Sequence, residues 1–295
     1  MKLATKTGDF ATFGLTQFEA AQCIAKSGFR YVDYSFFMDY DNRSGVYSEN
    51  WQTYCKELRE KTEKMGLCFV QAHAPMGKPI DEDNAAFLAD TIRSIEACAL
   101  LGIKNLVVHT GYMRGLSKEE TFEKNLRFFN ALLRVAESLG VNILAENFDK
   151  MCTDIYWMDN AADLLEFVRF VNHPNCHAIF DVGHANLQSI PIYDQILTLG
   201  NEIYALHIHD NMGDADAHQQ LFCGNLDVDG VIRALLEVGF NGYFTFECKS
   251  RFNLANGGTI GESTKNLPLL IRIEEEKLLY NIGKATLSAY GCFEE

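Results

Sequence analysis

The chain has 295 residues, 47% of them hydrophobic, and a formal net charge of −14. This length allows one large core, because α/β barrels of roughly 250 residues fold as a single domain. The acidic balance disfavours a general nucleic-acid-binding surface, and no apolar run approaches the roughly 18 to 20 residues that cross a bilayer. The nine cysteines form no CxxC pair, which predicts reduced thiols. We therefore expect a single domain over residues 1–295 in a cytoplasmic protein.

Short runs rich in β-branched and aromatic residues alternate with longer segments of helical period. This alternation is typical of parallel strands joined by crossover helices. An eighth strand is expected before residue 15, where the pattern is weak. A doubly wound open sheet is the alternative, but it would usually have a glycine-rich first βα turn, and none is present. The fold class is therefore predicted to be an α/β (β/α)₈ TIM barrel, with strands at 30–35, 67–73, 105–109, 141–146, 176–181, 203–209 and 243–247.

Helix boundaries are marked by two kinds of signal. The segments TQFE (16–19) and SKEE (117–120) are capping boxes, in which a hydroxyl and a carboxylate bond the free amides of a helix start. A glycine before the next strand, as a left-handed C-terminal cap requires, occurs in KSGF, KMGL, LLGI, SLGV and EVGF. Residues 262–290 are expected to form a C-terminal helical extension of the same domain.

Nearly every predicted strand ends in a metal-binding or acid–base side chain. These residues are His73, His109, Glu146, Asp181, His207 and Glu247. In a parallel barrel the carboxyl ends of all strands meet on one face, so the six side chains are expected to converge. Buried carboxylates this close would repel unless a divalent cation balanced them. The mixture of carboxylate and imidazole suits Mn²⁺, Zn²⁺, Co²⁺ or Mg²⁺.

Five motifs in a fixed order resemble a known family. They are VVHTG (107–111), LAEN (144–147), FDVGHA (180–185), ALHIHD (205–210) and FTFE (244–247). The chain resembles the xylose isomerase-like barrels, which include sugar isomerases, sugar 3-epimerases, inositol-pathway enzymes and endonuclease IV. The resemblance covers most of the chain.

This resemblance implies one divalent metal, with Mn²⁺ or Zn²⁺ favoured over Mg²⁺ and Co²⁺, bound by Glu146, Asp181, His207 and Glu247. It also implies that Glu146 and Glu247 carry a proton to and from the carbon beside the substrate's carbonyl. Such a transfer passes through an enediolate, whose charge a metal stabilises. The implied activity is a metal-dependent isomerase or epimerase of a sugar, sugar phosphate or inosose.

Two histidines on one strand face compete for the imidazole ligand position. His207 and His209 are two residues apart, so both point the same way. The residue pattern after the ligand histidine in the family favours His207. Asp210 is expected to contact the ligands and not the metal itself. His173 and His177 flank a turn and are interpreted as surface or junction residues.

Endonuclease IV is the main alternative, because residue types matching its nine zinc ligands are present here. The residues beyond the four above are His73, His109, His184, Asp216 and His218. In a sugar enzyme these five would contact the substrate or a second metal. The residues that flank the ligand positions resemble those of the sugar enzymes, and the net charge is acidic. Both observations favour a small-molecule sugar partner over nucleic acid. A non-catalytic metal-dependent sugar-binding protein is a third possibility, and a homo-oligomer is compatible with the sequence.

Some loop residues bear on the substrate. Gly213 stands where ketose 3-epimerases often carry an arginine, which speaks against a simple free-ketose 3-epimerase. Arg114, Lys249 and Arg251 could receive a phosphate or carboxylate, although solvated loop charges are the simpler interpretation. Aromatic residues that follow strand ends could form an apolar wall for a sugar ring or pack under loops: Phe36, Phe37, Tyr112, Phe148, Tyr156 and Trp157.

Overall fold

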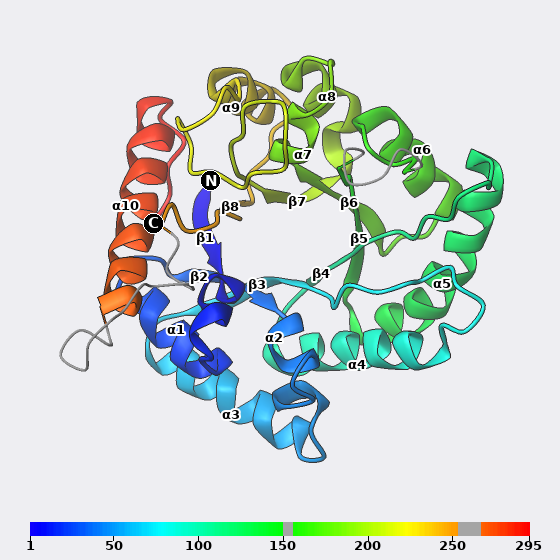
Figure 1. Ribbon diagram of the computed structural model, residues 1–295, viewed down its shortest axis with the longest axis horizontal. Helices are drawn as coiled ribbons and strands as arrows, with labels where there is room; N and C mark the ends of the chain where they lie inside the picture. The colour runs from blue at the N-terminus through cyan, green and yellow to red at the C-terminus, as the bar shows by residue number, and fades with distance from the viewer. Residues whose placement is uncertain (150–155, 253–266) are drawn as a thin grey trace.

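A computed structural model describes residues 1–149, 156–252 and 267–295. Within these residues, parallel strands form an 8-stranded sheet in the order β7-β6-β5-β4-β3-β2-β1-β8. The ends of this sheet meet at a parallel bridge between Ile208 and Phe246, which closes the barrel seen end-on in Figure 1. The (β/α)₈ prediction is therefore confirmed. The strands are β1 (Lys2–Lys6), β2 (Tyr31–Ser35), β3 (Cys68–His73), β4 (Asn105–Val108), β5 (Asn142–Glu146), β6 (Cys176–Asp181), β7 (Ile203–His207) and β8 (Tyr243–Thr245).

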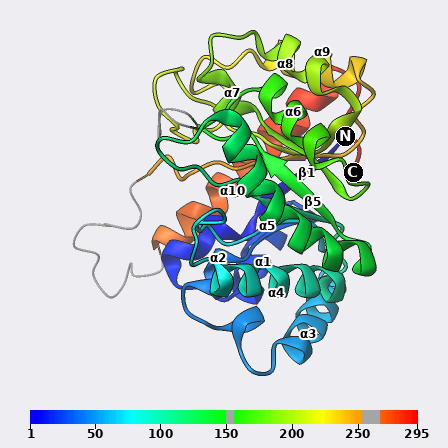
Figure 2. The same ribbon diagram turned by 90° about the vertical axis from the view of Figure 1, so that its right-hand side faces the viewer.

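Helices surround the strands as an outer layer (Figure 1). In the view turned by 90°, α8 and α9 lie at the top of the molecule and α3 at the bottom (Figure 2). The α-helices are α1 (Gln17–Ala25), α2 (Phe37–Tyr40), α3 (Trp51–Lys64), α4 (Ala85–Leu101), α5 (Lys118–Leu139), α6 (Ala161–Val171), α7 (Val182–Asn186), α8 (Ile192–Leu199), α9 (Val228–Glu237) and α10 (Leu267–Ala289). The 3₁₀ helices are η1 (Thr7–Phe13), η2 (Gly45–Tyr47) and η3 (Gly200–Glu202).

The predicted boundary signals are present. Thr16 with Glu19 and Ser117 with Glu120 form complete capping boxes at the starts of α1 and α5. Each box pairs amides that the first turn leaves without a helical partner. All five predicted junction glycines have a positive φ, namely Gly28, Gly66, Gly102, Gly140 and Gly239. These signals thus place the helix ends that return the chain to the next strand.

The barrel has an inner and an outer core. Val107, Leu144, Ile179 and Ala205 form a separate buried cluster inside the ring of strands. The much larger cluster lies between the strands and the helices. Because the inner layer is filled by side chains, the barrel is a solid support for the loops at its carboxyl face rather than a pore.

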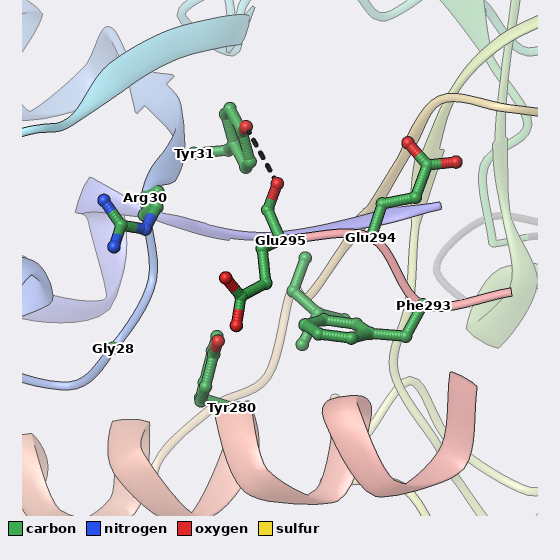
Figure 3. A pocket seen from close by; sticks show the side chains of 8 residues that line it. Gly28, Arg30, Tyr31, Tyr280, Phe293, Glu294 and Glu295 are labelled. Carbon is green, nitrogen blue, oxygen red and sulfur yellow. Dashed lines mark hydrogen bonds between the residues drawn. The ribbon is translucent and has the colours of Figure 1, made fainter. Parts of the chain in front are cut away.

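The weakly patterned eighth strand is β1. It pairs with β2 through Ala4 and Tyr31, and with β8 through Lys2 and Tyr243. α10 runs within the predicted 262–290 segment, of which residues 262–266 lie outside the described residues. At the amino ends of β1 and β2, a cavity of about 80 Å³ lies beside the last residues, and the Tyr31 hydroxyl donates to the backbone oxygen of Glu295 at 3.4 Å (Figure 3).

The eight cysteines in the described ranges are free thiols, and Cys152 lies outside those ranges. None of the helices described has both the length and the apolar character needed to cross a membrane.

Candidate metal centre

Four side chains from four neighbouring strand ends meet at the carboxyl face of the barrel. Glu146, Asp181 and His207 are the last residues of β5, β6 and β7, and Glu247 follows β8 by two residues. Each offers one donor atom, and these atoms all lie within 4.8 Å of one another. His207 Nδ1 is 2.7 Å from Glu146 Oε1 and 3.3 Å from Glu247 Oε2. Barrel closure therefore brings the four residues predicted as metal ligands into one group, which we call the central group.

The central group has the properties of a cation site. Glu146 Oε2 and Asp181 Oδ2 are buried and accept no hydrogen bond within the described residues, although His109 Nε2 lies 3.2 Å from Glu146 Oε2. A buried carboxylate oxygen without a partner is costly, and a bound cation removes that cost. Burial alone would raise the pKa of Glu146, but His207 and His109 lower it well below its usual value. Three carboxylates and one imidazole thus fit a divalent cation of the Mn²⁺ or Zn²⁺ type.

Asp33 orients the imidazole of the central group. His207 Nε2 lies 3.1 Å from Asp33 Oδ2, which also accepts a hydrogen bond of 2.7 Å from Gln71 Nε2. A proton on Nε2 bonds Asp33 and fixes the ring, and in the metal-free protein a second proton on Nδ1 bonds Glu146; a bound metal ion would take the place of that second proton. The sequence reasoning missed Asp33, although the signal was present: a carboxylate in the middle of the apolar run of β2.

Lys6 contacts the carboxylate oxygen of Glu247 that does not face His207. Its Nζ is 2.9 Å from Glu247 Oε1 and 3.9 Å from Asp9 Oδ1. Burial alone would lower the pKa of Lys6, but the Glu247 and Asp9 carboxylates raise it above its usual value. Arg272 of α10 contacts Asp9 Oδ2 at 2.9 Å, so the C-terminal helix is linked through Asp9 to this lysine. Lys6 was also missed, because it lies in the most weakly patterned strand.

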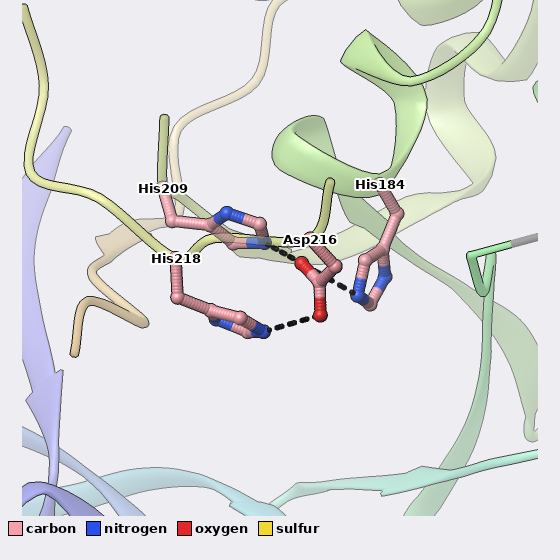
Figure 4. A group of neighbouring side chains, drawn as sticks. All are labelled: His184, His209, Asp216 and His218. Atoms are coloured by element: carbon pink, nitrogen blue, oxygen red, sulfur yellow. Dashed lines mark hydrogen bonds and ion pairs between the residues drawn. The ribbon is translucent and has the colours of Figure 1, made fainter. Parts of the chain in front are cut away.

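A second group of ligand-type side chains adjoins the first: His184, His209, Asp216 and His218 (Figure 4). Asp216 Oδ2 lies 2.9 Å from His218 Nε2, and its Oδ1 lies 3.7 Å from Nε2 of both His184 and His209. Burial alone would lower the pKa of His184, but Asp181 and Asp216 raise it to about 10. His209 Nε2 also contacts Asp181 Oδ1 at 3.0 Å. His209 thus lies between the two groups, a position that the sequence reasoning did not foresee.

The third group consists of His73, His109 and Glu146. Glu146 Oε2 is 3.2 Å from His109 Nε2 and 3.4 Å from His73 Nε2. The two imidazoles are 3.0 Å apart through their Nε2 atoms, and burial lowers the pKa of His109 to about 4. Glu146 therefore belongs to two groups, and all nine residues that sequence reasoning singled out lie in three adjoining clusters.

A cavity of about 190 Å³ reaches these groups and is lined by members of each of them. Phe37 and Phe148 contribute to its wall, and the Phe148 ring makes edge contacts with His109 and His184. Of the predicted aromatic residues, Phe36 is buried against Tyr34 and Trp157 packs against the core. Tyr112 and Tyr156 line a neighbouring cavity.

Other polar residues lie away from the ligand atoms. Asp210 accepts hydrogen bonds from the amides of Asn211, Gly224 and Leu226, so it shapes the β7–α9 loop. Lys249 and Arg251 border a cavity of about 660 Å³ that also reaches Lys6. His177 stacks on Tyr204 and contacts Glu202, and His173 lies 3.8 Å from Glu137.

Comparison with known proteins agrees with this architecture. Residues 21–267 match the family model described as "Xylose isomerase-like TIM barrel". An uncharacterized protein of Methanocaldococcus jannaschii is 28% identical over 207 residues, which make up 67% of this chain and 69% of that protein. The D-psicose 3-epimerase of Ruminiclostridium cellulolyticum is 25% identical over 176 residues, or 60% of this chain and 56% of the epimerase.

Among solved structures, a D-psicose 3-epimerase from Clostridium cellulolyticum H10, crystallised with D-tagatose, superposes with a TM-score of 0.76. The sequence identity is 18%, and the match covers 97% of this chain and 99% of the epimerase. This likeness concerns the fold.

Proposed function

Because this chain belongs to the xylose isomerase-like TIM barrel family, we propose that it is a metal-dependent sugar isomerase or epimerase. The observation that carries the proposal is the central group, in which two glutamates, an aspartate and a histidine offer donor atoms within 4.8 Å of one another. The relatives that carry the name of a sugar epimerase support the same class of substrate. The proposed substrates include both sugars and sugar phosphates.

The proposed metal ligands are Glu146, Asp181, His207 and Glu247. When bound, a divalent cation supplies Lewis-acid stabilisation for the negative charge that develops on the carbonyl and hydroxyl oxygens of the substrate. The five remaining residues of the second and third groups are proposed to contact the substrate or hold a further metal. They are His73, His109, His184, Asp216 and His218.

The proposed acid–base pair is Glu146 and Glu247, which both line the cavity. One carboxylate removes the proton from the carbon beside the carbonyl, and the other returns a proton to the same or the neighbouring carbon of the enediolate. Return to the same carbon on the opposite face gives an epimer, and return to the neighbouring carbon gives an isomer. Lys6 stabilises the ionised form of Glu247 through the 2.9 Å contact, which keeps this carboxylate deprotonated and lowers its basicity.

The test is solvent exchange with the purified, metal-loaded protein. We expect deuterium from D₂O to enter a carbon next to the carbonyl of at least one sugar in a panel of ketoses, aldoses, inososes and sugar phosphates. Glu146→Gln and Glu247→Gln should each slow the exchange by about 10² to 10⁴-fold, whereas the control Glu49→Gln, at an exposed position, should not. The absence of exchange with every sugar would contradict the proposal. A sugar that binds without exchange would favour the non-catalytic sugar-binding protein.

One observation favours a second candidate, an endonuclease of the endonuclease IV type. The three groups contain a residue of matching type for each of the nine zinc ligands that the resemblance to endonuclease IV implies. Against it stands the net charge of −14, which opposes phosphate binding outside a local groove. The zinc-loaded protein should be incubated with a DNA duplex that contains one abasic site. Clean incision beside that site, with three zinc ions per chain by elemental analysis, would replace the sugar-enzyme proposal.

A further inference from the structure

A second cavity opens beside the one at the metal centre. This side cavity has a volume of about 440 Å³, compared with about 190 Å³ for the cavity at the three groups. The two cavities share Met76, His109 and Phe148 as lining residues. The two cavities therefore adjoin at these residues, so the side cavity is the nearest space for a part of the substrate that extends beyond the metal centre.

The lining of the side cavity combines aromatic and apolar side chains with polar and charged ones such as Arg114. Tyr112, Met113 and Tyr156 belong to it. The ring centroids of Tyr112 and Tyr156 are 6.1 Å apart in an edge arrangement, and Phe148 lies 5.6 Å from Tyr156 in the same way. Such a surface binds a ring that presents an apolar face, because aromatic side chains bury large areas against flat partners.

The walls of the side cavity are held in place by contacts with the metal centre and with each other. The hydroxyl of Tyr156 contacts the Thr110 hydroxyl and donates to the backbone oxygen of Glu146 at 3.3 Å. At Gly111, a Cβ would lie 2.8 Å from Pro79 and 2.9 Å from Ile80, so only glycine lets the loops after β3 and β4 approach this closely. These contacts fix Tyr156 and Gly111 in the wall of the cavity.

We propose that the substrate of this protein is a conjugated sugar, in which a second ring occupies the side cavity while the sugar occupies the metal centre. This inference rests on the proposed isomerase or epimerase function. The chemistry requires a free carbonyl and a free neighbouring hydroxyl, so the second ring must be linked through another carbon. A second sugar ring and an aryl group share the required apolar face, and the experiment distinguishes them.

The experiment compares a free ketose with two conjugates of it. Binding of D-fructose, 6-O-α-D-glucopyranosyl-D-fructose and 6-O-benzyl-D-fructose to the Mn²⁺-loaded protein is measured by isothermal titration calorimetry, and deuterium exchange is followed for the same three compounds. At least one conjugate should bind tenfold or more tightly than D-fructose. The glucosyl compound identifies a sugar as the second ring, and the benzyl compound identifies an aryl group. If neither conjugate binds at least tenfold more tightly, the inference is wrong.

A substitution that fills the side cavity provides the second readout. Met113 lines the side cavity but not the cavity at the metal centre. Met113→Trp should weaken binding of the preferred conjugate at least tenfold and leave D-fructose binding unchanged. The matched control is Met212→Trp, since Met212 is 54% exposed in the β7–α9 loop and borders neither of these cavities. Equal losses for free and conjugated sugar, with unchanged circular dichroism, would overturn the assignment.

The two proposals can fail separately. Exchange into the free ketose, with no preference for either conjugate, overturns the conjugated substrate and supports the sugar isomerase or epimerase. Preferred binding of a conjugate without exchange into any sugar supports the side cavity as a binding site and overturns the proposed activity.

Discussion

His207 Nδ1 lies 2.7 Å from Glu146 Oε1, although the two residues are 61 positions apart. Asp181, at the end of the strand between theirs, places its own carboxylate within the same group. In the absence of a cation, the imidazole and the carboxylate thus satisfy one another. A bound metal ion would have to replace this contact, and the affinity for metal should therefore depend on every side chain that holds these two atoms in place.

The first prediction concerns Asp181→Asn. Loss of one negatively charged ligand should lower Mn²⁺ affinity by about 100-fold. Mutation of a residue that only orients a ligand already costs about 10 to 100-fold. Asp181 also caps α7 by accepting the amide of His184 at 2.8 Å, and asparagine can keep that cap. Titration calorimetry, together with the rise in melting temperature on adding Mn²⁺, measures the effect. Asp83→Asn, at an exposed position, is the control, and an unchanged affinity in D181N would exclude Asp181 as a ligand.

The second prediction concerns Asp33→Asn. An amide in place of the carboxylate weakens the contact that fixes the ring of His207, which is 3.1 Å away. Mn²⁺ affinity should fall about 10 to 100-fold, as for other residues that orient a metal-binding histidine. Asp41→Asn, on the exposed surface after the same strand, should bind Mn²⁺ like the parent protein. If D33N did the same, the proposed orientation of His207 would be incorrect.

The third prediction concerns Lys6→Met. This change leaves Glu247 without the ammonium group 2.9 Å from its Oε1, and both side chains are largely buried. The metal-free protein should lose about 3 kcal/mol of unfolding free energy, because a buried charge remains without its partner. Urea unfolding checks the loss. Lys2→Met in the same strand removes only a lysine that lies over the Tyr31 ring and should cost less than about 1 kcal/mol; equal losses in the two variants would argue against the Lys6–Glu247 pair.

The fourth prediction concerns pH and Asp39. Burial raises the pKa of Asp39 to about 6, even though the Tyr34 hydroxyl and the Val46 amide donate to it. The folded state therefore favours the protonated acid, and the stability that this group contributes at low pH is lost as pH rises through 6. Asp39→Asn removes the titration. Between pH 4.5 and 7.5 the parent protein should lose about 2 kcal/mol relative to D39N in urea unfolding. A pH-independent difference would show that Asp39 titrates normally.

Much of the ligand arrangement could be predicted because barrel geometry is regular. Once β5, β6 and β7 are recognised, their last residues must meet at one face, and Glu146, Asp181 and His207 do. His209 was harder to place. It shares a strand face with His207, and only the structure shows that its ring turns towards Asp216 and Asp181.

Features that arise between segments could not be predicted from periodicity. Lys6 lies in the short strand β1, whose pattern is weak, and its contact with Glu247 joins residues 241 positions apart. The side cavity depends on how closely the loop at Gly111 approaches Pro79. Local sequence does not report such distances, because they are set by the packing of whole loops on the barrel.

The junction between β7 and β8 lies directly beneath the central group. There the strands are joined by hydrogen bonds from Ile208 to Thr245 at 2.8 Å and from Glu247 to Ile208 at 3.0 Å, in place of the longer ladders between the other neighbours. His207 lies on the β7 side of this junction and Glu247 on the β8 side. A metal ion bound by both side chains would link β8 to β7. Metal would then stabilise the closed barrel as well as prepare it for chemistry, so metal binding should increase the free energy of unfolding.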